Sequence, residues 1–261
     1  MAVILPLVLS TALLGQAADN KASLAELQKR VETTQITLLA DEGTKVGGAR
    51  APLVEKPVFR YSDELRQIED AGIWLWTDHN RPVAVMKVER YKPGRFPTPC
   101  LYCFASLSSG LVRAEWVDAM PFEARQPGVK WQPLDDEPAA TRPARLVQMR
   151  DLARRFSAEI LTDPEGKDRT QMRLLTRPLF RFDESSDVRD GALFGFTGTG
   201  TNPDLLLLID LPTNGGWRFG AVSMTAEGVR MKLKDNLVYE SPHTAGKGKV
   251  FDTWCYFRPT K

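Results

Sequence analysis

The sequence has few of the residues that enzymes use for nucleophilic or metal-assisted chemistry. Its 261 residues include only two histidines and three cysteines. Lysine and arginine number 35 against 33 acidic residues, so no strong net charge draws the chain to nucleic acid or to an anionic membrane surface. We therefore predict no resident cofactor, no metal and no nucleic-acid partner, and we favour a protein that is not an enzyme.

Long apolar segments are also scarce. The apolar run at residues 1–14 is shorter than the roughly 20 residues that cross a bilayer, and it leads into Gly15 and Ala17, the small-x-small pattern of a signal peptidase site. This predicts a signal peptide over residues 1–18 and an exported protein, periplasmic or secreted, without a stable membrane span. Its partners would be envelope or extracellular proteins. No Lys or Arg precedes the run, so a buried N-terminal strand and a misassigned start codon remain alternatives.

The three cysteines are Cys100, Cys103 and Cys255, an odd number for an oxidising compartment. Proline precedes Cys100 and an apolar run follows it, which indicates a strand, whereas a redox Cys-x-x-Cys motif places its first sulfur at a helix N-terminus. We favour a structural role, with a disulfide from Cys103 to Cys255 or from Cys100 to Cys103. A zinc site would need a further ligand such as His79 or His243.

Short apolar runs rich in β-branched and aromatic residues predict a mainly β (α+β) fold. A short helix is expected near residues 23–32, and a second, over about 143–161, from an apolar stripe ending at Phe156 and Ile160. Prolines punctuate the connector before the second helix. The predicted segments are a signal peptide (1–18), an N-terminal helix and linker (19–56), a β-meander (57–117), a Pro-rich linker with a helix (118–162) and a second β-meander (171–261).

Three blocks of sequence recur in the same order about 120 residues apart, which is the mark of an internal repeat. The blocks are 57–61 with 178–182, 73–77 with 193–197, and 105–113 with 222–230. A single antiparallel meander leaves one apolar face in water, so two related meanders are expected to pack as one sandwich or barrel-like body over residues 57–261. We expect rough two-fold pseudo-symmetry between them.

The second half carries the segment Arg-Leu-Leu at 173–175, Pro-Leu-Phe-Arg-Phe at 178–182, Asp-Gly-Ala-Leu-Phe at 190–194 and Asn-Pro-Asp followed by four leucines at 202–208. In these motifs, over about the last 120 residues, it resembles a family of uncharacterised exported bacterial proteins. The resemblance implies export and no particular activity.

Two pairs of residues are candidates for ligand binding. Trp74 and Trp76 stand two apart on a predicted strand and so share a face, as in a stacking platform, although the repeat replaces them with phenylalanines and favours core packing. Arg60 and Arg181 occupy the same place in the two repeats. An anion site and a buried ion pair are competing interpretations, and we favour the ion pair.

A catalytic interpretation rests on Asp78 and His79 with Ser106 or Ser108 as nucleophile. The sequence lacks a Gly-x-Ser-x-Gly elbow, and Asp78-His79-Asn80 is typical of a turn. We therefore expect a non-catalytic extracytoplasmic binding or interaction module. The alternative is a hydrolase with its site at the seam between the two halves.

Overall fold

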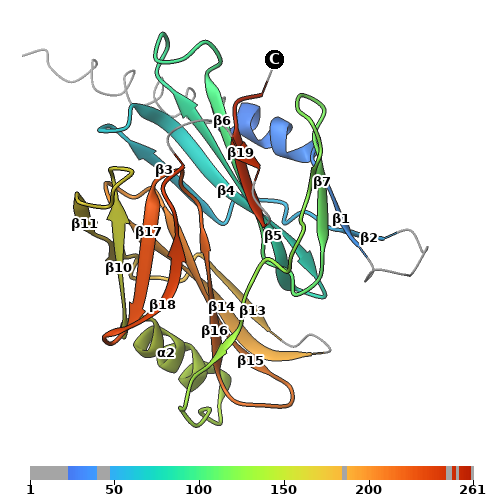
Figure 1. Cartoon of the computed structure of the whole chain (residues 1–261). Coiled ribbons are helices and arrows are strands. Elements are labelled where there is room, and N and C mark those ends of the chain that lie inside the picture. Colours follow the sequence, from blue (N-terminus) through green and yellow to red (C-terminus); the bar gives the residue numbers. More distant parts are fainter. Residues whose placement is uncertain (1–22, 40–47, 184–186, 245–248, 251–252, 260–261) are drawn as a thin grey trace, which may run out of the picture.

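The computed structural model of the chain describes residues 23–39, 48–183, 187–244, 249–250 and 253–259. The expected signal peptide lies outside these ranges. The prediction of a mainly β fold is confirmed, since antiparallel sheets pack against one another as a sandwich and the described residues form no closed barrel (Figure 1). No described helix combines the length and the apolar character needed to cross a membrane.

Two six-stranded sheets form the centre of the molecule. The first central sheet has the order β19 (Lys249–Val250), β20 (Trp254–Phe257), β6 (Cys100–Ser106), β5 (Arg81–Tyr91), β4 (Ile68–Asp78) and β3 (Phe59–Asp63). The second central sheet has the order β12 (Arg173–Leu174), β14 (Val188–Thr197), β15 (Leu205–Pro212), β16 (Arg218–Ser223) and β9 (Gln132–Pro133), and β13 (Phe180–Asp183) also pairs with β14.

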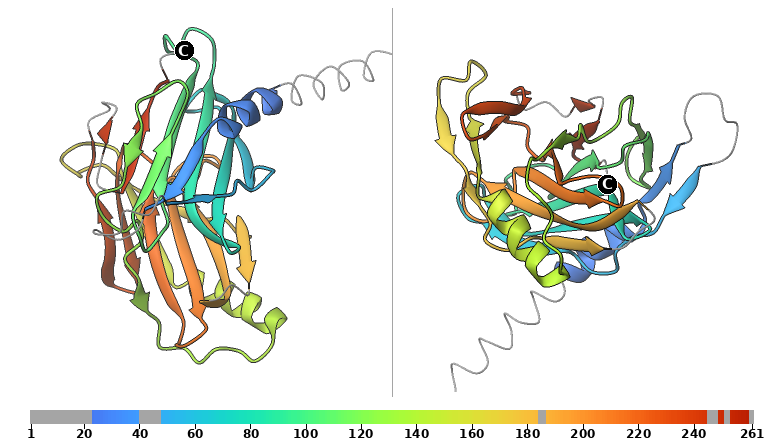
Figure 2. Two further views of the ribbon diagram at one scale, coloured as in Figure 1. Left: turned by 90° about the vertical axis from the view of Figure 1, so that its right-hand side faces the viewer. Right: turned by 90° about the horizontal axis from the view of Figure 1, so that it is seen from below.

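Each central sheet has a smaller outer sheet and one helix on its outer side. The first outer sheet runs β2 (Ala49–Ala51), β1 (Gln35–Leu38), β7 (Val112–Glu115) and β8 (Phe122–Glu123), and residues 23–32 form its helix. The second runs β11 (Arg169–Gln171), β10 (Phe156–Leu161), β17 (Gly228–Leu233) and β18 (Asn236–Ser241), beside α2 (Arg142–Ala153). The two helices lie toward opposite ends of the molecule (Figures 1 and 2).

The central strands are apolar on both faces because both faces are covered. On β15, Leu205 and Leu207 contribute to an outer core with α2, while Leu206 and Leu208 point into the core between the two central sheets. A strand buried on both sides reads as a continuous apolar run rather than an alternating one. The core between the central sheets is called the seam below, and it contains side chains from both halves of the chain.

The same order of elements occurs twice. A helix leads into an outer strand (β1 or β10), a four-stranded meander follows (β3–β6 or β13–β16), and a further outer strand pairs with the first (β7 with β1, β17 with β10). The final strand of each half then joins the central sheet of the other half. Strand β9 pairs with β16, and β20 pairs with β6. The two halves are thus interlocked through their backbones.

The second predicted helix is too long. Thr141 caps α2 by accepting a hydrogen bond from the Ala144 N–H at 3.3 Å, but the helix ends at Ala153 and the following residues form β10. Phe156 and Ile160 are four residues apart, a spacing that places two side chains on one face in a helix and in a strand alike. The apolar stripe therefore could not distinguish the two structures.

Candidate functional site

The predicted aromatic platform is part of the core. Trp74 is 0% exposed and Trp76 is 1% exposed, and both pack beneath the first outer sheet. The Trp74 indole N–H donates to Gln28 Oε1 at 2.7 Å. Phe194 and Phe196 are buried in the same way in the second half. Neither tryptophan presents a ring face on which a ligand could stack.

Arg60 and Arg181 form matching ion pairs. Arg60 donates to both carboxylate oxygens of Asp70 at 2.8 Å, and Arg181 donates to both oxygens of Asp190 at 3.0 and 2.8 Å. Asp190 is fully buried and also accepts from Arg145 of α2 at 2.8 Å. These ion pairs link the strands β3 and β13 to the neighbouring strands β4 and β14, and they correspond to the interpretation preferred over an anion site.

The disulfides considered from the sequence do not form. All three cysteines are buried free thiols. Cys103 faces the seam, while Cys100 and Cys255 lie in the core under the first outer sheet, on the opposite side of the same central sheet. Cys100 and Cys103 are three residues apart on β6, so they are about 10 Å apart and beyond the reach of a disulfide. Burial raises the pKa of all three thiols, that of Cys103 to about 12, which keeps them protonated and unreactive.

Asp78 and His79 do share a pocket with Ser108, but without the geometry of a triad. This hairpin pocket has a volume of about 270 Å³ and is lined by Leu38, Asp78, His79, Arg81, Pro82, Val83, Ser108, Ser109 and Asp187. His79 Nδ1 lies 2.9 Å from Asp78 Oδ1, yet the His79 side chain is 74% exposed. Among the described residues no hydrogen bond joins His79 to a serine; the Ser108 hydroxyl accepts from the Gly110 N–H at 3.0 Å.

The turn explains why His79 is there. His79 and Asn80 both have positive φ, 47° and 66°, in a two-residue loop between the paired residues Asp78 and Arg81. Such a tight hairpin needs two left-handed residues, and Asn and His tolerate that conformation better than most. Ser106, the other candidate nucleophile, is fully buried. The arrangement is that of a turn rather than of a catalytic centre.

Acidic residues in β13, in β14 and in the segment that joins them form ion pairs with arginines. Asp183 pairs with Arg142, Asp187 with Arg81, and Asp190 with Arg145 and Arg181. In the part of the chain that the structure describes, no group of three or more His, Cys, Asp or Glu side chains is placed to hold a metal ion.

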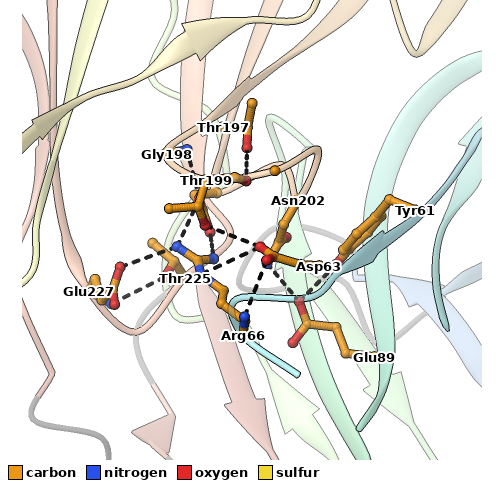
Figure 3. A network of polar contacts seen from close by, with 12 residues as sticks. Tyr61, Asp63, Arg66, Glu89, Thr197, Gly198, Thr199, Asn202, Thr225 and Glu227 are labelled. Atoms are coloured by element: carbon orange, nitrogen blue, oxygen red, sulfur yellow. Dashed lines mark hydrogen bonds and ion pairs between the residues drawn. The ribbon is translucent and has the colours of Figure 1, made fainter. Parts of the chain in front are cut away.

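The most unusual polar feature is a buried network that crosses the seam (Figure 3). Its centre is Lys87 on β5, which is 3% exposed. The Lys87 ammonium donates to Asn202 Oδ1 at 3.0 Å, Pro203 O at 3.3 Å and Met224 O at 2.7 Å, all in the other half of the chain. It also lies 3.4 Å from Glu89. A buried ammonium is tolerated only with such complete compensation.

Glu89 completes this part of the network. Its carboxylate accepts hydrogen bonds from Tyr61 at 2.8 Å, Tyr91 at 2.9 Å and Asn202 at 3.1 Å. Burial by itself would raise the pKa of Glu89, but the charge of Lys87 and the tyrosine hydroxyls outweigh it and leave that pKa below its usual value. Glu89 is therefore ionised at neutral pH.

Arg66 extends the network toward solvent from the turn between β3 and β4. Its guanidinium donates to both carboxylate oxygens of the fully buried Asp204, at 2.5 and 3.3 Å, and lies 3.5 Å from Glu227. Asp63, which is 2% exposed, accepts from the Thr199 hydroxyl at 3.1 Å. Figure 3 shows Arg66 between Asp63 and Glu227, with partners from both halves around it.

A cavity of about 160 Å³ opens beside this network. We call it the seam pocket, and it is lined by Arg66, Lys87, Glu89, Tyr91, Leu101, Asn202, Met224, Thr225, Ala226, Glu227 and Tyr256. Both halves contribute to its wall. The pocket thus combines concave shape, buried charge and two aromatic rings, the features expected of a site for a small ligand.

Sequence reasoning did not find this site. Lys87 and Glu89 are polar positions in a predicted strand, and Asn202, the partner that they share, is more than 110 residues away in the sequence. Asn202 stands out in the sequence only as the first residue of the Asn-Pro-Asp motif. A Lys and a Glu two apart in an otherwise apolar central strand are the one local signal, since charged residues are rarely buried without partners.

Comparison of the chain with protein-family models, with curated proteins and with solved structures finds no match.

Proposed function

We propose that the protein is a non-catalytic, extracytoplasmic binding module and that the seam pocket holds a small polar ligand. The observation that carries this proposal is that the pocket wall is built from both halves around buried, hydrogen-bonded charges. Fixed charges of this kind orient a ligand without needing to rearrange. The hydrolase alternative has weaker support, because His79 is mostly exposed and no described hydrogen bond links it to a serine.

The seam pocket can be blocked without touching the buried network. Ala226 lies at its wall, and the repeat aligns Ala226 with Ser109, which lines the hairpin pocket. Ala226→Phe fills the seam pocket, while Ser109→Phe makes the matched change at the other pocket. A library of small polar molecules is screened by the shift in melting temperature, since a ligand that binds only the folded state stabilises it.

We expect ligands that stabilise the wild type and Ser109→Phe to have no effect on Ala226→Phe. Hits that survive in Ala226→Phe and vanish in Ser109→Phe would move the site to the hairpin pocket. The absence of any hit in the wild type would count against a small-molecule function.

Export is part of the same proposal. The apolar residues 1–14 and the small residues at 15 and 17 support it, as does the resemblance to exported bacterial proteins. Expression in a bacterial host, followed by mass spectrometry of the periplasmic fraction, should give a chain that begins after Ala17 or Ala18. A full-length chain confined to the cytoplasm would contradict it. Envelope or extracellular proteins are then the partners within reach.

A further inference from the structure

The charged donors that line the seam pocket are already hydrogen-bonded to the protein. Lys87 donates its three N–H groups to Asn202, Pro203 and Met224, and an ammonium has no more than three. Arg66 directs both terminal nitrogens at carboxylates. An anionic ligand would have to displace one of these bonds. Its own carboxylate would also meet the carboxylates already present.

Glu227 is the carboxylate best placed to receive a ligand. It stands at the rim with 33% of its side chain exposed. Arg66 lies 3.5 Å from Glu227 but is closer to Asp204, at 2.5 Å. In the part of the chain that the structure describes, Glu227 Oε1 accepts no hydrogen bond. Burial raises the pKa of Glu227, which indicates that Arg66 does not fully compensate its charge.

The charged groups around the pocket also carry a net negative charge. Four carboxylates belong to the network, Asp63, Glu89, Asp204 and Glu227, against the two cations Arg66 and Lys87. Arg258 also approaches, 5.1 Å from the centre of the Tyr91 ring, and His243 lies near Glu227. With Arg258 counted and His243 left out of the sum, one negative charge is still left over.

Aromatic rings complete the wall. Tyr91 and Tyr256 line the pocket, and the Tyr91 ring already attracts a guanidinium to one side. The faces of tyrosine rings attract cations, and aromatic walls combined with a carboxylate are a general solution for ammonium groups.

Taking the seam pocket as the binding site, we infer that its ligand is a small organic cation, an amine or quaternary ammonium head group that pairs with Glu227 against the tyrosine rings. The hairpin pocket does not offer the same chemistry. The repeat places Gly110 where Glu227 stands and Arg81 where Asn202 stands.

The test compares probes of different charge, two of which have the same shape, by isothermal titration calorimetry. Choline is the cationic probe, 3,3-dimethylbutan-1-ol is its neutral isostere, ethylammonium is a smaller cation and acetate is the anion. Choline or ethylammonium should bind at least about tenfold more tightly than the neutral isostere, the difference expected for a charge-assisted contact. Glu227→Gln should reduce cation binding by a similar factor. Glu240→Gln, which changes an exposed carboxylate paired with Arg230, is the matched control and should have no effect.

The outcomes separate the two claims. If the neutral isostere or acetate binds as tightly as the cations, and Ala226→Phe abolishes that binding, the seam pocket is a ligand site but the cation inference is wrong. If cations bind equally well to wild type and Glu227→Gln, the assigned role of Glu227 is wrong and the inference falls with it. If no probe binds in a manner that Ala226→Phe prevents, the proposed function itself fails.

Discussion

Arg81 and Asn202 occupy corresponding positions in the two halves and make corresponding contacts across the seam. Each directly precedes a proline at the start of a long central strand. Arg81 Nη2 reaches Asp210 Oδ2 in the second half at 3.1 Å, and Asn202 Nδ2 reaches Glu89 Oε1 in the first half at 3.1 Å. Asp210 and Glu89 are themselves at matching registers of β15 and β5. The exchange is reciprocal, as pseudo-two-fold symmetry requires.

The two ends of the seam have nevertheless acquired different chemistry. Asp210 is held by Arg218 at 2.6 Å and by Arg81, and the Trp131 ring lies 4.4 and 5.1 Å from their guanidinium carbons. At this end, two guanidinium groups that lie over one indole ring hold Asp210. At the other end, Asn202 takes the place of Arg81, and the seam pocket opens there.

Replacing Lys87 with methionine should destabilise the fold severely. Lys87→Met leaves Glu89 buried without its cation and leaves two backbone carbonyls unpaired. We expect a loss of about 3–5 kcal/mol in the free energy of unfolding, measured with urea at pH 7. Adding Glu89→Gln should recover part of the loss. A cost below about 1 kcal/mol for the single variant would show that the network contributes little.

The ionisation of Glu89 should be visible in the pH dependence of stability. Its pKa is lowered in the folded protein, so its stabilising effect is fully present above its ordinary pKa and is lost as the pH falls through the folded value. The difference in unfolding free energy between wild type and Glu89→Gln should therefore be constant near neutrality and shrink in acid. A difference that grows as the pH falls would contradict the assigned direction.

All three thiols should be protected in the folded protein. Burial keeps them protonated, and the strand register prevents any two from bridging. Ellman's reagent at pH 8 should detect no thiol in the native protein purified without reductant, and three after denaturation in guanidinium chloride. Detection of a single thiol in guanidinium would establish a disulfide.

Gly128 should tolerate no side chain. A Cβ at this position would lie 2.1 Å from the Ser106 carbonyl oxygen, a backbone atom that cannot rotate away. We expect Gly128→Ala to cost about 1–3 kcal/mol or more. Gly110→Ala is the control, since its nearest neighbour is the Ser108 hydroxyl at 3.7 Å, and it should change stability by less than about 0.5 kcal/mol. Equal effects of the two substitutions would refute the close approach.

The sequence predicted the fold where its signals were local or repeated. The equivalence of Arg60 and Arg181 was visible in two similar pentapeptides. The apolar run at 205–208 predicted a strand, and the structure shows that both of its faces are covered. The boundary of α2 was missed because Phe156 and Ile160 suit a helix and a strand equally. The helix at 23–32 and β1 also belong to the order of elements that recurs, although no matching sequence block marked them.

The site could not be predicted because it depends on contacts between halves. Alignment of the repeats makes Arg81 and Asn202 equivalent, but it does not reveal that each faces a carboxylate of the opposite half. In the sequence Lys87 has no visible partner, because its acceptors Asn202, Pro203 and Met224 approach it only in the folded protein. Strand β9 was likewise not predicted, because it lies in the proline-rich connector. It is a short edge strand, in which Pro133 is tolerated.

Separation of the two halves shows whether each central sheet depends on the other to bury its inner face and to complete its edge. The chain is divided between Asp135 and Asp136, and the fragments 19–135 and 136–261 are studied alone and mixed by circular dichroism and proton NMR. Each fragment alone should lack a cooperative unfolding transition, and an equimolar mixture should regain one together with dispersed amide signals. A cooperative transition in either fragment by itself would show that one half folds without the other.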